Sequence, residues 1–430
     1  MDENIVKQPH THFITMKKTV VFLFLFPGFV FSQTLNIEQC YDLARKNYPL
    51  IQQNDLIAKT KEFTLENLSK NWLPQINVTG QATYQSDVTE LPIQLPNVNF
   101  TPLSKDQYKI FADVSQSLFD GGAVKNQKKL AEIQSEISLK QNEAELDQLK
   151  ERINQLYFGV LLTDEQLAQT ALTKTDFENG LKKAEAQLKN GVIFRSNVDV
   201  LKAQLVDLEQ SEIELRNMKK NFLAMLSVFI HQNLDENTML QKPEKNLSKN
   251  ENKRTELQWF DLRKTALETQ KMLLHSKNSP KLGAFLQGGY GKPGLNMLKN
   301  EFDVFYMAGL RLTIPVSGFY TQKNDRNLLE NQERDLDIQK ENFLFNQHLQ
   351  SVQNTNELQK IQELIDKDNE LVTLRESIKK ASLAQLENGV ITTSDYIREV
   401  NAEQQAKLQK IRHEIQYLLS IYNQKALFNN

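Results

Sequence analysis

Cysteine, glycine and proline are scarce in this 430-residue chain, and each shortage excludes a class of structure. The single cysteine, Cys40, excludes an internal disulfide framework and a cysteine-based zinc cluster. The 15 glycines and 11 prolines amount to about 6% of the residues, whereas globular proteins usually carry roughly 12%. So few breakers predict long uninterrupted elements, and the abundance of Leu, Lys, Gln, Asn and Glu favours helices.

An excess of charge of either sign is also missing. The chain has 52 Lys and Arg against 54 Asp and Glu, a formal net charge of -2, which gives no electrostatic reason to expect a nucleic-acid partner. The histidines lack partners at metal-ligand spacing, and those in helical stretches, such as His413, are expected to be solvated. No cluster of acid, base or nucleophile stands out, so we expect no enzyme, no cofactor and no metal site.

The N-terminal residues follow the order of a signal peptide. A basic start at Met16 precedes an apolar run over 20–31, which ends at the small residue Ser32. The run is too short to span a bilayer, which takes about 20 residues; a buried core element is the alternative. Residues 1–15 fit neither interpretation and suggest that Met16 is the true initiator. Because no lipoprotein cysteine follows the run, we expect an exported protein without a lipid anchor.

The rest of the chain consists of two similar halves. The segment over 186–196, AQLKNGVIFRS, recurs over 384–394 as AQLENGVITTS, and eight of the eleven positions are identical. Such self-similarity indicates a repeated architecture. The predicted organisation is an N-terminal extension and signal peptide over 1–32, a first repeat over 33–230, a linker or equatorial segment over 231–254, and a second repeat over 255–430.

Each repeat is predicted to open with a helix and to continue with two strands. The opening helices cover 35–68 and 256–274, where apolar residues are spaced three and four apart. The strands that follow begin after prolines, which disfavour helix in the residue before them. They are expected over 76–89 and 108–118 in the first repeat and over 282–291 and 302–314 in the second. The second strand of each pair alternates apolar with mostly polar residues, as a half-buried strand does.

A very long helix follows the strands in each repeat. It is expected over 123–189 in the first repeat and over 322–387 in the second, and each would reach roughly 100 Å. Leucines and isoleucines at heptad spacing indicate coiled-coil packing. The duplicated Asn-Gly interrupts the helix as a turn, and shorter helices return over 196–230 and 394–428.

Four amphipathic strands cannot form a core of their own beside a coiled coil, so their apolar face needs another partner. A closed barrel in an outer membrane provides one, because closure leaves no unpaired backbone edge in lipid. Soluble packing of the strands against helices is the alternative. The helices exceed a bilayer several-fold and belong in water, which predicts a barrel continued by a helical tunnel. The positions assigned to membrane strands are Tyr108, Ile110, Val114, Leu118, Phe302, Val304, Tyr306, Leu310 and Leu312.

The order of elements resembles the TolC-like outer-membrane efflux protein family over about 33–430. The resemblance rests on the segment WLPQ over 72–75, the segment SLFDGG over 117–122, and the duplicated glycine turns. Ser117 departs from the usual proline, which the second copy keeps as Pro315. The resemblance implies a mainly α fold with a β-barrel part, in which a homotrimer builds a twelve-strand barrel in outer-membrane lipid.

The same resemblance implies a function and partners. The helical tunnel would stand in the periplasm and open when an adaptor protein and an inner-membrane pump dock. The trimer would then be an exit duct from periplasm to exterior, in tripartite efflux or type I secretion. A periplasmic coiled-coil adaptor is the alternative function, but it calls for one hairpin between small β-rich domains, whereas two hairpins and four strands are expected here.

Asp395 matches the position where family members place an aspartate at the periplasmic constriction. Three copies around a threefold axis would form an acidic ring that favours cations. Asn197 is the corresponding residue of the first repeat, and Asp199 lies two residues further on. Asp395 also suits the cap of the returning helix, and both roles can hold.

The hairpin tips are the expected contacts with the adaptor. Glycine suits the positive φ of such turns, so plain turn formation is the alternative role. The tip residues are Gly191, Val192, Ser196, Gly389, Val390 and Ser394.

Overall fold

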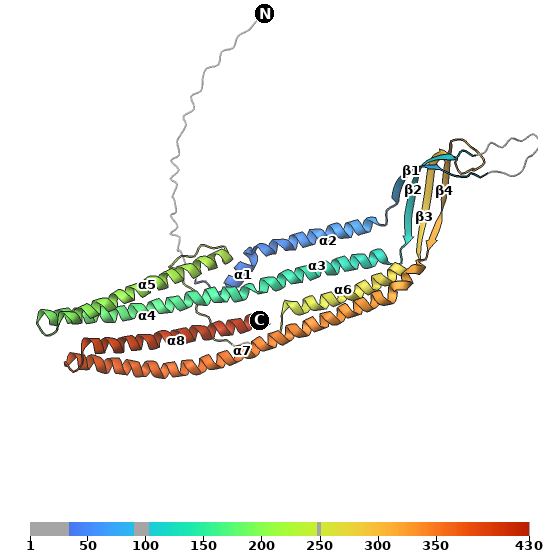
Figure 1. Ribbon diagram of the computed structural model, residues 1–430. Coiled ribbons are helices and arrows are strands. Elements are labelled where there is room, and N and C mark those ends of the chain that lie inside the picture. The colour runs from blue at the N-terminus through green and yellow to red at the C-terminus, as the bar shows by residue number, and fades with distance from the viewer. Residues whose placement is uncertain (1–33, 90–102, 247–250, 430) are drawn as a thin grey trace, which may run out of the picture.

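A computed structural model describes residues 34–89, 103–246 and 251–429. Over these ranges the molecule is elongated: a small sheet lies at one end, and long helices run away from it (Figure 1). The predicted extension and signal peptide over 1–32 lie outside the described residues.

The opening helix of the first repeat is broken, contrary to the single helix expected over 35–68. It consists of α1 (Ile37–Asn47), a 3-10 turn (Pro49–Gln52) and α2 (Gln53–Lys70). Tyr48 is extended, with φ -67° and ψ 131°, because a residue before proline avoids the helical region. Pro49 lacks an N–H and therefore ends the first hydrogen-bond ladder.

The four strands form one antiparallel sheet in chain order, so that pairing of β2 with β3 joins the two repeats. The first strand ends at Tyr84, earlier than expected, and Phe302 lies one residue before the last strand. The bounds are β1 (Gln75–Tyr84), β2 (Asp106–Phe119), β3 (Lys281–Lys292) and β4 (Asp303–Thr313).

The register gathers the apolar side chains on one face of the sheet. Ile76 lies opposite Val114, Val114 opposite Leu286, and Leu286 opposite Ala308. Directly paired residues share a face, and alternate residues along a strand return to it. The predicted alternation is therefore confirmed. This apolar face is open in the single chain, as the 78% exposure of Tyr306 shows.

Six helices form the rest of the two repeats: α3 (Ala123–Asp147), α4 (Leu149–Lys189), α5 (Arg195–Ile230), α6 (Thr255–Asn278), α7 (Phe319–Glu387) and α8 (Thr393–Phe428). A 3-10 turn, Val316–Gly318, precedes α7. With 69 residues, α7 is unbroken and spans about 100 Å. No helix in the described ranges combines the length and apolar character needed to cross a membrane.

The prediction of one uninterrupted helix over 123–189 is wrong, because the chain forms two helices, α3 and α4, which are separated at Gln148. The preceding residue, Asp147, is buried and fastened to two other elements. Its Oδ2 accepts hydrogen bonds from Thr255 Oγ1 at 2.7 Å and from Asn429 Nδ2 at 2.9 Å. The break thus coincides with the place where α3 meets the start of α6 and the end of α8.

The helices lie side by side in one layer. Near the sheet the neighbours run in the order α2, α3, α6, α7, and further away the order is α5, α4, α8, α7 (Figure 1). The two hairpins, α4 with α5 and α7 with α8, end far from the sheet. The described chain therefore forms a single layer of helices rather than a closed bundle.

The main apolar core lies in the middle of the molecule, where α1, α4, α5 and α8 meet. It includes Cys40, Tyr157, Leu226 and Ile421, each at most 1% exposed, and burial of each large apolar side chain contributes about 1.5–3 kcal/mol. Burial, with the charge of Glu38, raises the pKa of the Cys40 thiol to about 12. The thiol is therefore protonated and unreactive at neutral pH.

The segment between the repeats is fastened to this core. Leu35 forms a parallel bridge with Leu240. The hydroxyl of Tyr157 on α4 donates to the carbonyls of Leu35 at 2.9 Å and of Gln241 at 2.7 Å. The joining segment therefore passes α4 near the start of that helix, around the mid-length of the molecule.

Candidate functional site

The two hairpin tips are closed by the same backbone turn. Gly191 and Gly389 have φ of 72° and 73°, a left-handed conformation that glycine adopts without strain. At the first tip Gly191 N donates to Leu188 O and Val192 N donates to Gln187 O, both at 2.9 Å. The same pair of bonds closes the second tip at 3.0 and 2.9 Å. This Schellman geometry satisfies the last helical carbonyls and explains why Asn-Gly-Val occurs in both repeats.

Large apolar side chains project from both tips. Val192 is 69%, Phe194 81% and Val390 71% exposed, and Ser196 and Ser394 are exposed in the first turns of the returning helices. The sequence analysis did not single out Phe194. The sequence could have pointed to Phe194, because this residue occupies one of the three positions where the two tip segments differ.

Asp395 caps the start of α8. It forms a capping box in which Asp395 N donates to Thr392 Oγ1 at 3.2 Å and Thr392 N donates to Asp395 Oδ2 at 3.2 Å. Arg398 Nη2 lies 2.8 Å from Asp395 Oδ1. The hydrogen bonds from Thr392, and then the charge of Arg398, hold the pKa of Asp395 below its usual range. The capping role expected as the alternative is present, and Arg398 offsets part of the negative charge.

The first repeat arranges the corresponding residues differently. The N-cap of α5 is Phe194, whose side chain accepts no capping hydrogen bond. Asp199 Oδ2 lies 3.8 Å from Arg195 Nε, both being exposed, and Asn197 is half-buried. Asn197, Asp199 and Asp395 all lie in the first turns of α5 and α8, at the end of the molecule remote from the sheet (Figure 1).

Ion pairs hold the two hairpins together near these tips. Lys183 Nζ on α4 lies 3.0 Å from Glu387 Oε1 on α7, and Lys379 Nζ on α7 lies 3.1 Å from Asp176 Oδ2 on α4. Lys379 also lies 2.6 Å from the buried carboxylate of Glu403 on α8. Partial burial acts to lower the pKa of Lys379, but the hydrogen bonds with Glu403 and Asp176 raise it. These ion pairs join the α4–α5 hairpin to the α7–α8 hairpin, so the two tips lie side by side.

Comparison with known proteins identifies this arrangement. Residues 41–227 match the family described as Outer membrane efflux protein. Among solved structures, the CmeC outer membrane channel of Campylobacter jejuni has a TM-score of 0.63 at 13% identity, over 91% of this chain and 85% of that one. The outer membrane protein VceC of Vibrio cholerae has a TM-score of 0.65 at 13% identity, over 91% and 95%.

The MtrE outer membrane channel of Neisseria gonorrhoeae has a TM-score of 0.62 at 11% identity, over 91% of this chain and 88% of that one. No curated protein sequence matches. The resemblance to TolC-like outer membrane efflux proteins is thus confirmed: a little under half of the chain matches the family, and the fold of the described residues is similar to that of solved outer membrane channels. The mainly helical fold with a small antiparallel sheet, built on an internal duplication, is the fold expected from the sequence.

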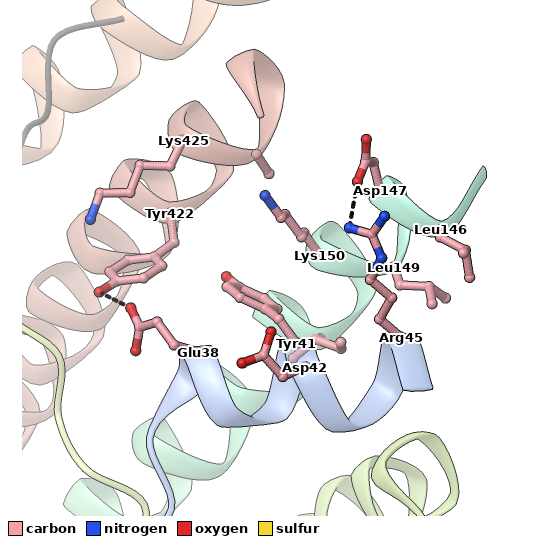
Figure 2. Close-up of a pocket in the computed structure, with 12 residues that line it drawn as sticks. Glu38, Tyr41, Asp42, Arg45, Leu146, Asp147, Leu149, Lys150, Tyr422 and Lys425 are labelled. Carbon is pink, nitrogen blue, oxygen red and sulfur yellow. Dashed lines mark hydrogen bonds and ion pairs between the residues drawn. The ribbon is translucent and has the colours of Figure 1, made fainter. Parts of the chain in front are cut away.

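A cavity of about 420 Å³ lies at mid-length between α1, α4 and α8 (Figure 2). Four of its charged groups, Glu38, Arg45, Asp147 and Lys150, form contacts between elements. Tyr422 Oη donates to Glu38 Oε1 at 3.5 Å, and Arg45 Nη1 lies 3.8 Å from Asp147 Oδ1. Lys150 Nζ, also at the cavity, donates to the side chain of Asn429. The cavity therefore lies where the first helix, α1, contacts the last helix, α8.

One histidine lies where the sequence analysis did not expect it. His413 on α8 is only 8% exposed, and its Nδ1 lies 2.6 Å from Oδ2 of the buried Asp368 on α7. The expectation that His413 is solvated is wrong, because the α7–α8 contact covers it. Within the described ranges, no three His, Cys, Asp or Glu side chains are grouped so that they could hold a metal ion.

Proposed function

We propose that three copies of this chain form a channel through the outer membrane, which serves as an exit duct from periplasm to exterior in tripartite efflux or type I secretion. The observation that carries the proposal is the sheet, which combines an exposed apolar face with two open edges. The match of residues 41–227 to the outer membrane efflux protein family, and the similarity of the fold to solved outer membrane channels, support it.

The two edge strands of the sheet, β1 and β4, need strands of another chain to pair with. β1 pairs with β2 and β4 pairs with β3, and neither outer edge pairs with another strand of the described chain. Open edges with an apolar face are unstable in water and in lipid alike. Three copies would place β4 of one protomer beside β1 of the next and close a twelve-strand barrel. Since eight strands enclose a space just filled by side chains, twelve leave a wider lumen.

The layer of helices also needs further copies of the chain to cover its exposed apolar side chains. Single copies expose large apolar side chains along α4, α5 and α7, and a ring of three protomers would cover them. Representative residues are Leu172, Ile213, Leu328, Ile338, Phe345 and Leu371. With a barrel in lipid, helices of about 100 Å extend into the periplasm as a tunnel.

The hairpin tips suit contact with a periplasmic adaptor and, through it, an inner-membrane pump. Val192, Phe194 and Val390 are exposed at the end remote from the sheet, where the tunnel would end. Asp395, Asn197 and Asp199 lie in the same region and are proposed to line the periplasmic aperture.

The test is the assembly of the full chain in a membrane. We expect the protein in detergent-extracted outer membrane as a trimer that dissociates on heating, and conducting channels after reconstitution in a planar bilayer. A monomer that is soluble without detergent would contradict the proposal and favour the adaptor alternative.

A further inference from the structure

The base of the sheet carries a second charged site. The base is the end next to the helices, where β1 and β3 begin and β2 and β4 end (Figure 1). Lys281 pairs with Thr313, and Gly283 pairs with both Ser117 and Arg311. Paired residues share a face, so the side chains of Lys281 and Arg311 lie on the polar face, opposite the apolar one.

These two cations border a cavity of about 220 Å³. Besides them, its polar-face lining is hydroxyl groups and one aromatic ring: Ser115, Ser117, Phe285 and Thr313. The lining contains no carboxylate, and within the described part of the chain neither cation forms an ion pair. Guanidinium, ammonium and hydroxyl groups are donors suited to an anion.

Of the two acidic residues closest along the chain to Ser117, one is hydrogen-bonded to the start of α3 and the other lies far from the two cations. Asp120 follows β2 directly, but its carboxylate accepts hydrogen bonds from Gly122 N at 2.8 Å and Val124 N at 2.6 Å at the start of α3. Asp113 lies on the polar face four residues before Ser117, about 13 Å along the strand. Lys281 and Arg311 therefore outnumber Asp120, the one carboxylate among the described residues that follows a strand at the base.

Arg311 is held in place. Its guanidinium carbon lies 4.9 Å from the centre of the Phe285 ring. Phe285 pairs with Gly309, and a Cβ at Gly309 would come within 2.9 Å of that ring. The glycine therefore lets the ring lie across the strand, and stacking on the ring orients the guanidinium. Arg311 is thus an oriented donor rather than a loose surface charge.

We propose that the base of the sheet is an anion-binding site, which takes carboxylate, phosphate or sulfate groups of molecules passing through the lumen. The inference rests on the proposed function, because three copies would bring six cationic groups into one ring on the inner wall of the barrel. Rings of like charge select ions of opposite sign. The channel then has a cationic ring at the base of its barrel in addition to the acidic residues at its periplasmic end.

The test uses the full-length trimer in a planar bilayer of net-neutral phosphatidylcholine, with inorganic triphosphate as the probe. We expect triphosphate to block the current of the unaltered channel. In the double variant Lys281→Gln, Arg311→Gln the blocking concentration should rise at least about tenfold, and the reversal potential in a KCl gradient should shift toward cation selectivity. Because the lipid is the same for every variant, a difference between them cannot come from its headgroups.

Lys109→Gln is the matched control. Lys109 lies on the same polar face at the other end of the sheet, where it pairs with Gly291, which pairs with Asp303. Its removal should change the block less than twofold. Arg311→Lys keeps the charge but loses the planar donor and its stacking, so it should weaken the block and leave the reversal potential in place.

The outcomes separate the two proposals. If all variants conduct and are blocked equally, the anion site is wrong and the channel stands. If no preparation forms a conducting trimer, the proposed function fails and the lumen site fails with it.

Discussion

At the scale of single residues, the tip glycines are needed for their backbone conformation alone. A Cβ at Gly389 would have no atom within 4 Å, yet φ is 73°. We expect Gly389→Ala to destabilise the folded trimer by about 1 kcal/mol per chain, and Gly389→Asn to cost less, measured by thermal unfolding in detergent. Gly80 is equally open without a positive φ, so Gly80→Ala is the control. Equal losses at both positions would contradict the argument.

Asp395 combines a helix cap with a charge at the proposed aperture. Asp395→Ala removes both and should raise single-channel conductance or weaken cation selectivity. Asp395→Asn keeps a side-chain oxygen for the cap and removes only the charge, so it should change selectivity with little effect on folding. Unchanged current and selectivity in both variants would place Asp395 outside the aperture.

The capping carboxylate also has a predictable pH dependence. Because its pKa is lowered in the folded chain, its stabilising effect is present above the unfolded pKa of about 3.9 and is lost as pH falls through the folded value. The wild type and Asp395→Ala should therefore converge in thermal stability below about pH 3.9. A constant difference across this range would show that the ionised form contributes nothing.

At the scale of elements, α7 and α8 are joined by a buried polar pair. Asp368→Ala leaves the covered Nδ1 of His413 without its partner, so we expect a loss of about 1–3 kcal/mol in the free energy of unfolding. Replacing both residues with leucine should recover much of it, because removing both partners with apolar residues of similar volume leaves no buried polar group unpaired. Lys367→Ala is the control, because its pair with Glu370 is exposed and worth less than about 1 kcal/mol. Similar losses in both single variants would contradict the argument.

At the scale of the whole molecule, the two faces of β4 should tolerate charge differently. Leu310 lies on the apolar face and Met307, three residues away, on the polar face. Leu310→Arg should lower the yield of trimer in outer membranes, because arginine facing lipid costs about 2–4 kcal/mol near the bilayer centre. Met307→Arg should assemble normally, as judged by heat-modifiable migration in gels. Equal yields would contradict a barrel with its apolar face outward.

Several features of the fold were predictable because their causes are local. Alternation in the second strands follows from a period of two residues, and the Asn-Gly turns follow from the glycine that a left-handed cap requires. The burial of His413 and the break at Gln148 were not predictable, because each depends on which helix lies opposite. The exposed Phe194 could have been found by asking where the duplicated segments differ.

The sequence by itself determined the duplicated order of elements, the long helices and the amphipathic strands, since hydrophobic period, turn residues and repeats act over short stretches of chain. Only the tertiary structure decided that β2 pairs with β3 and that the first and last helices meet at mid-length. It also decided that Lys281 and Arg311 share a face around an aromatic ring. Register and helix neighbours arise from contacts between residues far apart in the chain, which no local pattern specifies.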